Sequence, residues 1–114
     1  MTAKLPAGFE ALEPFVDSWA LATTAARAQR RSDSTPAERE AFHAAGLDLI
    51  APALDHLDSR PLDALTVPEQ TLMNLALAYA HVVLAVEVQG PDEPRHAELR
   101  RFMRIVHSPS DPVA

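Results

Sequence analysis

The sequence predicts an all-α fold, a small four-helix bundle-like domain built around one central helix. The strongest observation is the stretch from about 67 to 89, whose inner part, LMNLALAYAHVVLAVEV, is apolar on nearly every face. A helix that is apolar all round has to be surrounded by other elements. Only 3 glycines but 10 prolines occur in 114 residues, which favours helices separated by prolines. No segment shows the alternation of a strand.

The length predicts a single domain. We expect a flexible N-terminal arm over residues 1–8, a helical domain over 9–107 and a flexible C-terminal tail over 108–114. The chain has no cysteine, which excludes disulfides, thiolate metal sites and cysteine nucleophiles and fits a cytoplasmic protein. The net charge of −6 disfavours binding to nucleic acid or to an anionic membrane.

The first helix is indicated by apolar residues at helical spacing, at Phe9, Leu12, Val16, Trp19, Ala20, Thr23 and Ala26. Pro14 either begins a helix near Glu13 or kinks one that starts near Phe9. The helix is expected to end at Arg27, Arg30 and Arg31, because cations suit the negative end of its dipole.

The second helix has a clear start signal, since Thr35-Pro36-Ala37-Glu38 forms a capping box with proline at the first helical position. Its apolar stripe is expected to run to Leu57. Pro52 cannot donate to the carbonyl of Asp48, so we expect a bend there.

A single turn over 62–65 is expected to place Leu62 and Leu65 on the core. Thr66-Val67-Pro68-Glu69 repeats the capping pattern, and Gly90 is suited to cap the end of the central helix. A last helix is predicted from about 94 to 107, with its inward face at Leu99, Phe102, Met103 and Val106.

Two Glu-x-x-His sequences raise the hypothesis of a carboxylate metal site, because di-iron bundles use this motif on two helices. The weak candidates are Glu40, His43, Glu87 and His96. Their placement, at a helix start or beside the apolar stripe, argues against the hypothesis. We therefore expect no metal and no cofactor.

The polar residues of the central helix suggest a second kind of site. Asn74 and His81 lie two turns apart on one face, whereas Tyr79 points elsewhere. An apolar pocket near His81 and Asn74, walled by Tyr79 and Trp19, could hold a small apolar ligand. Two plainer interpretations stay open: His81 is a satisfied core histidine, or the polar stripe marks the side nearest water.

The arginines form a third feature, at Arg27, Arg30 and Arg31 and then at Arg95, Arg100, Arg101 and Arg104. A charged helix face is ordinarily solvated. The sharper hypothesis is a docking face for an acidic partner or an anionic ligand. Nucleic acid is disfavoured because no aromatic residues interleave the arginines.

No catalytic motif occurs, and no motif is specific enough to name a family. The leading hypothesis is a small non-enzymatic interaction or accessory protein that acts on a protein partner. The alternatives are a small-molecule-binding module or small enzyme with a pocket near His81, and the metal-binding bundle. Three short partner helices would not cover every face of the central helix, so we expect a two-fold homodimer. Acidic flanks argue against a membrane span.

Overall fold

The computed structural model describes residues 4–100, and within this range the chain forms helices and no strand. The α-helices are α1 (Val16–Trp19), α2 (Thr24–Asp33), α3 (Pro36–Gly46), α4 (Ile50–Asp58), α5 (Val67–Val83) and α6 (Glu93–Arg100). Three 3₁₀ segments, η1 (Glu10–Phe15), η2 (Leu62–Ala64) and η4 (Gly90–Asp92), join them, and a π-helical segment, η3 (Leu84–Gln89), extends α5. The all-α, bundle-like fold expected from the sequence is confirmed.

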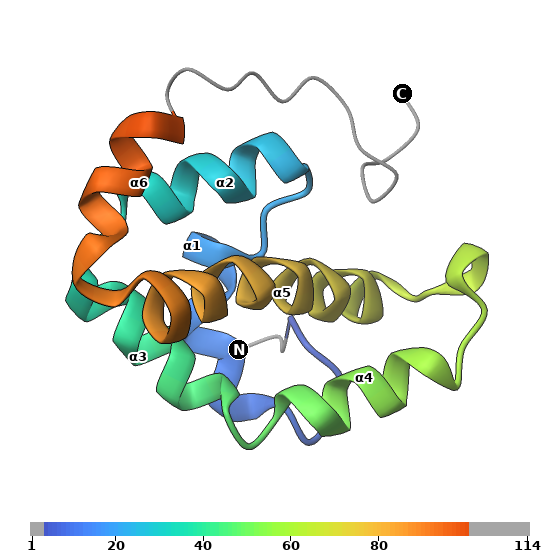
Figure 1. The fold of residues 1–114 in the computed structure, drawn as a ribbon. Helices are drawn as coiled ribbons and strands as arrows, with labels where there is room; N and C mark the ends of the chain where they lie inside the picture. Colours follow the sequence, from blue (N-terminus) through green and yellow to red (C-terminus); the bar gives the residue numbers. More distant parts are fainter. Residues whose placement is uncertain (1–3, 101–114) are drawn as a thin grey trace.

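Helix α5 lies across the centre of the molecule, with α1 and α2 above it and α3 and α4 below it in Figure 1. The buried side of α5 carries Leu72, Leu75, Tyr79 and Val82. With η3, the helical run ends at Gln89, as the sequence predicted, and Gly90 caps it with a positive φ of 44°. The change to π geometry at Leu84 was not predicted.

Both predicted capping boxes are present. The Thr66 Oγ1 atom accepts from the backbone N–H of Glu69, whose carboxylate accepts from the N–H of Thr66 at 3.0 Å. Thr35 and Glu38 form the same pair of bonds at the start of α3. These motifs involve only residues three apart, which explains why the sequence predicts them well.

The predicted first helix is divided into η1, α1 and α2. The backbone leaves helical geometry at Ala20, and Thr23 begins α2 as its N-cap, with its hydroxyl accepting from Ala26 N–H. The carbonyl of Leu21 in the break accepts a bond of 2.8 Å from the guanidinium of Arg27. A side chain six residues later therefore satisfies a backbone group that a continuous helix would have bonded itself.

The predicted second helix is also divided, between Gly46 and Ile50. Its bend was expected at Pro52, but Pro52 lies in the first turn of α4, where its missing N–H does no harm. Gly46 packs against the ring of Tyr79 so closely that an added Cβ would lie 2.7 Å from Cδ1 and closer still to Cε1. The close approach of α3 to α5 thus requires glycine at this position.

Two smaller expectations need correction. Only Leu65 of the predicted pair packs against the core, because Leu62 is 72% exposed. The expected arm over residues 1–8 includes Leu5, which is buried in the core, and its N–H donates to Glu13. The last part of the predicted final helix, from 101 to 107, and the tail over 108–114 lie outside the described residues.

Candidate functional site

The most unusual part of the molecule is a buried polar junction where α2, α3, η3 and α6 meet. Its residues, which we call the arginine junction, are Arg31, Ser34, Arg39, Gln89 and Glu93. Four of them are almost fully buried: Arg31 is 5% exposed, Ser34 7%, Arg39 6% and Glu93 1%. Charged side chains are seldom buried to this degree unless they are paired.

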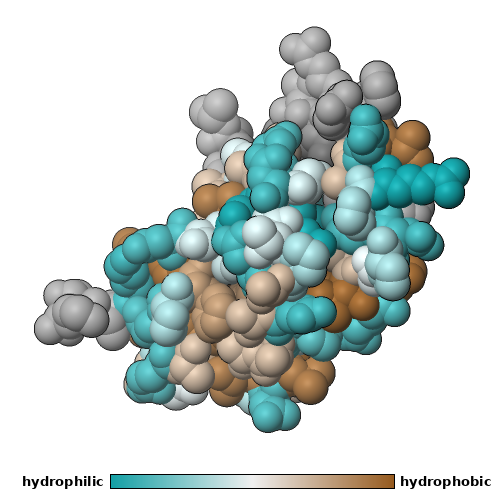
Figure 2. All heavy atoms as spheres, turned by 90° about the vertical axis from the view of Figure 1, so that its left-hand side faces the viewer, coloured by the Kyte–Doolittle hydropathy of each residue, from teal (hydrophilic) through white to brown (hydrophobic). Residues whose placement is uncertain are grey.

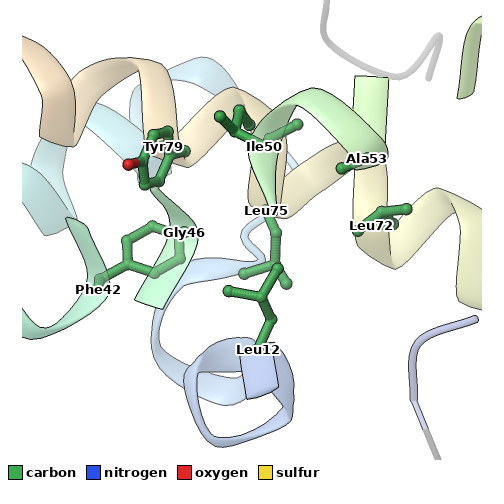
Figure 3. A pocket seen from close by; sticks show the side chains of 9 residues that line it. Leu12, Phe42, Gly46, Ile50, Ala53, Leu72, Leu75 and Tyr79 are labelled. Carbon is green, nitrogen blue, oxygen red and sulfur yellow. The ribbon is translucent and has the colours of Figure 1, made fainter. Parts of the chain in front are cut away.

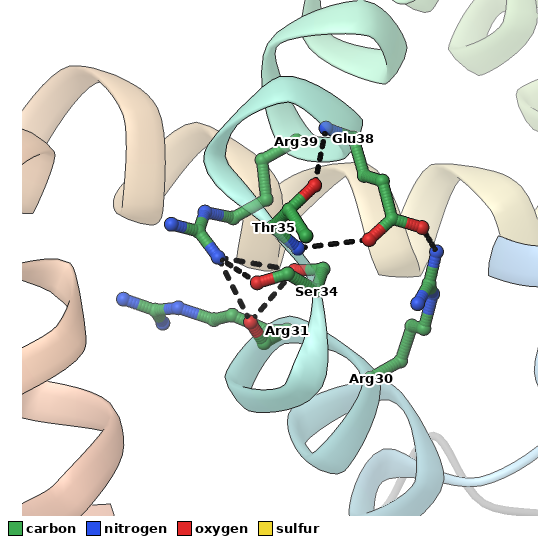
Figure 4. A network of polar contacts seen from close by, with 6 residues as sticks. All are labelled: Arg30, Arg31, Ser34, Thr35, Glu38 and Arg39. Atoms are coloured by element: carbon green, nitrogen blue, oxygen red, sulfur yellow. Dashed lines mark hydrogen bonds and ion pairs between the residues drawn. The ribbon is translucent and has the colours of Figure 1, made fainter.

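Local structure positions the two arginines. The Ser34 hydroxyl donates to the carbonyl of Arg31 at 2.8 Å and closes the end of α2, and the capping box at Thr35 then starts α3 one residue later. This short connection places Arg39 over the end of α2. Its Nη1 donates to the Ser34 carbonyl at 2.6 Å and to the Ser34 hydroxyl at 3.2 Å (Figure 4).

Arg31, on α2, bonds to two elements that follow α5 in the chain, η3 and α6. Its Nη2 donates to a carboxylate oxygen of Glu93 on α6 at 2.9 Å and to the side-chain oxygen of Gln89 on η3. Breaking a buried ion pair on one side commonly costs about 3–5 kcal/mol. Since Gln89 belongs to a π-helical segment, and such segments are frequent at functional sites, the junction is the strongest candidate site by structure.

Arg30 points away from this junction. It lies over the ring of Trp19, 4.6 Å from its centroid, and donates to Glu38 at 2.7 Å. The bond from Arg30, followed by that from the Thr35 backbone, lowers the pKa of Glu38 to about 2. Arg30 therefore links the start of α3 to the aromatic core.

The structure does not bring the four predicted pocket residues together. Trp19 and Tyr79 are buried and both contact Phe42, with ring centroids 5.0 and 5.5 Å apart. Tyr79 donates to the His43 carbonyl at 2.9 Å, and burial, followed by the charges of nearby acidic groups, raises the pKa of its hydroxyl.

Asn74 and His81 are half-buried on another side of α5, and Asn74 accepts from the exposed Gln70 at 3.2 Å. This placement favours the interpretation that the polar stripe marks the side of the helix nearest water.

An apolar hollow lies between η1, α3, α4 and α5 (Figure 3). Its cavity volume is only about 10 Å³, the space of about one water molecule. It is lined by Leu12, Phe42, Gly46, Ile50, Ala53, Leu72, Leu75, Ala76 and Tyr79. None of Trp19, Asn74 or His81 is among these residues. Because the Tyr79 hydroxyl is bonded to the backbone of His43, the hollow has no polar group available to orient a ligand.

Of the metal candidates, His43 and Glu87 meet at 2.6 Å, whereas Glu40 is an exposed residue of α3. The side chain of His96 lies outside the described residues. Within the part of the chain that the structure describes, no group of three or more His, Asp or Glu side chains converges as metal ligands would.

The prediction that the arginines form solvated helix faces is wrong for two of them. Arg27 and Arg31 do not lie on a solvated face, because they are 2% and 5% exposed. Arg95 is exposed on α6, whereas the side chain of Arg100 and residues Arg101 and Arg104 lie outside the described part. Figure 2 shows the left-hand side of the molecule in Figure 1. Hydrophilic residues cover much of the upper half of this side, where Figure 1 places α2 and α6.

Arg39 was not identified as a site residue from the sequence. The pairing of Glu93 with Arg31 was also not predicted. A signal for Arg39 existed, because Arg39, Phe42 and Gly46 follow helical spacing and share the buried face of α3. No local signal joins Arg31 to Glu93, which lies 62 residues later.

Among the described residues, one stretch of consecutive helical segments, Val67–Arg95, which spans α5, η3, η4 and the start of α6, is long and apolar enough to cross a membrane by length and composition alone. This is weak evidence, because core helices share these properties. Comparison of the chain with known protein families, with curated proteins and with solved structures gave no match.

Proposed function

We propose that the protein is a non-enzymatic interaction protein that pairs with a second copy of itself through the uncovered side of α5 and η3. This open face consists of Met73, Leu77, Ala80, Leu84 and Val88. Leu84 is 47% exposed and Val88 70%, Ala80 is exposed, and the other two are half-buried. The single observation that carries the proposal is an apolar strip on the outside of the most apolar helix.

The spacing of the strip suits a second copy. In two antiparallel helices related by a two-fold axis between positions 80 and 81, Leu77 meets Leu84 of the other copy, and Met73 meets Val88. Both of these pairings are then apolar, and the small Ala80, whose counterpart is His81 of the other copy, lies near the axis where the two helices approach most closely. A two-fold interface needs such self-complementarity, because the same patch serves both partners.

The polar neighbours of the strip support the same arrangement. Gln70, Asn74 and His81 border the open face on one side, and Glu87 borders it on the other. An apolar centre with a polar rim is the ordinary composition of a protein interface. The apolar hollow gives less support to a ligand-binding function near His81, because His81 is not part of its lining.

The test is the molar mass in solution, measured by light scattering at micromolar concentration, for the wild type, Leu84→Asp and the control Leu62→Asp. Leu62 is 72% exposed on η2, outside the strip. We expect a two-chain mass for the wild type and the control and a one-chain mass for Leu84→Asp, with the helical circular dichroism of all three preserved.

A one-chain wild type would overturn the proposal. If that single chain also sedimented with lipid vesicles, the open face would be a membrane-binding surface instead. A Leu84→Asp variant that keeps the two-chain mass would show that any dimer uses another surface.

A further inference from the structure

Among the residues that the structure describes, the arginine junction contains two buried guanidinium groups but only one buried carboxylate bonded to them. Arg31 and Arg39 extend to the same side of the α2–α3 connection in Figure 4. They are close neighbours, since Nη1 of Arg39 reaches the Ser34 carbonyl that follows α2 and lies 3.5 Å from the carbonyl oxygen of Arg31. Two cations thus share one poorly solvated region.

Arg31 and Arg39 differ in whether a negative charge balances their own. Arg31 has the Glu93 carboxylate at 2.9 Å, whereas Arg39 donates only to neutral oxygens of Ser34 and Arg31. Among residues 4–100, no carboxylate forms an ion pair with Arg39. A buried cation without a counter-charge is costly, because burial removes water that would have stabilised the charge.

The unused donors indicate what would complete the site. Arg39 bonds through Nη1 alone and Arg31 through Nη2 alone, and Nε of Arg31 is buried without a partner in the described part of the chain. The planar fork of arginine presents its N–H groups in pairs that match the oxygens of a phosphate or a carboxylate. One carboxylate, that of Glu93, already occupies part of this region.

We propose that Arg31 and Arg39 form a binding site for one small oxyanion of phosphate size, either free inorganic phosphate or the terminal phosphate of a small ligand. A doubly charged anion suits the excess positive charge that remains after the Arg31–Glu93 pair. Arg39 keeps 6% of its surface exposed, so the site lies just below the surface of the protein. This site is separate from the open face of α5 and does not depend on dimerisation.

The experiment titrates inorganic phosphate against the melting temperature, with sodium chloride at matched ionic strength as the reference. The variants are Arg39→Gln, Arg39→Lys and the control Arg95→Gln, which removes an exposed charge from α6. Phosphate should raise the melting temperature of the wild type and the control in a saturable manner, because a ligand that binds only the folded state stabilises it.

Arg39→Gln should weaken the apparent affinity at least tenfold, and Arg39→Lys should fall between the two, because lysine keeps the charge but loses the fork. Each variant is compared with its own melting temperature in chloride, so a lower starting stability does not decide the result. If Arg39→Gln does not fold, the lysine variant and phosphorus NMR line broadening of the wild type carry the test.

A parallel titration with glycerol 3-phosphate separates the two sources of the anion. Tighter binding than inorganic phosphate identifies the site as a receptor for a phosphate ester, and weaker binding identifies it as a site for the free anion. Equal phosphate shifts in the wild type and Arg39→Gln, or no shift beyond the chloride reference, would overturn the proposal.

Discussion

The two faces of α5 and its π-helical extension η3 are nearly alike in composition and opposite in environment. The inner face carries Leu72, Leu75 and Val82, each 2% exposed or less. The open face carries Leu84 and Val88, which are 47% and 70% exposed. Hydropathy does not distinguish the two, so the difference comes from which side the other helices cover.

This contrast has an energetic meaning. Full burial of a leucine or valine side chain stabilises the folded state by about 1.5–3 kcal/mol relative to exposure. The inner face gains this stabilisation within one chain. The open face gains it only when another surface covers it, which is the physical basis of the proposed association through that face.

The largest difference between the inner and the open face is expected when Leu75→Ala and Leu84→Ala are compared in their free energies of unfolding. Removing the buried side chain of Leu75 should lower the free energy of unfolding by about 2–5 kcal/mol, because it leaves a cavity. Leu84→Ala should change it by no more than about 0.5 kcal/mol at concentrations where single chains dominate. Urea denaturation at several protein concentrations measures both.

A difference in stability between the wild type and Leu84→Ala that grows with protein concentration would support association through the open face, since dimerisation makes stability depend on concentration. Equal losses for the two variants would show that the open face contributes to the core after all.

The inner face is tested next by Gly46→Ala. The added Cβ would overlap the ring of Tyr79, and overpacking of this kind typically costs about 1–3 kcal/mol. Thermal denaturation measures the loss. The double variant Gly46→Ala/Tyr79→Leu should show a smaller loss relative to Tyr79→Leu alone, and an unchanged loss would place its cause outside this contact.

The smallest effect is expected from acid, which acts on the helix starts rather than on either face. The backbone of Thr66, followed by His56, lowers the pKa of Glu69, and the pKa of Glu38 is about 2. A lowered folded-state pKa means that both carboxylates contribute their full stabilisation above the unfolded value, about 4.3, and lose it as the pH falls.

We therefore expect the urea midpoint to decline as the pH falls from 5 toward 2, by about the amount that a helix cap contributes in general. Glu69→Gln should flatten this decline, because glutamine keeps the capping geometry without a titrating group. A midpoint that rises on acidification would contradict the assigned direction.

Local signals account for the parts of the fold that were predicted well. Thr35–Glu38 and Thr66–Glu69 begin their helices through bonds within one turn. The apolar run after Val67 forms a helix that bonds its own backbone groups and can therefore be buried. The breaks at Ala20 and after Gly46 were missed, because the groups that favour them, Arg27 and Tyr79, act across space.

The candidate site likewise has features that local sequence signals predict and features that depend on distant segments. The all-α class, the central helix and the excess of apolar residues on that helix follow from residue types and their spacing, and they can be predicted without a structure. The burial of Arg31 and Arg39 and the exposure of the strip at Leu84 depend on how distant segments pack, and they become visible in the fold. A charge is buried or exposed according to its partners, and Glu93, the partner of Arg31, comes from a helix 62 residues further along the chain.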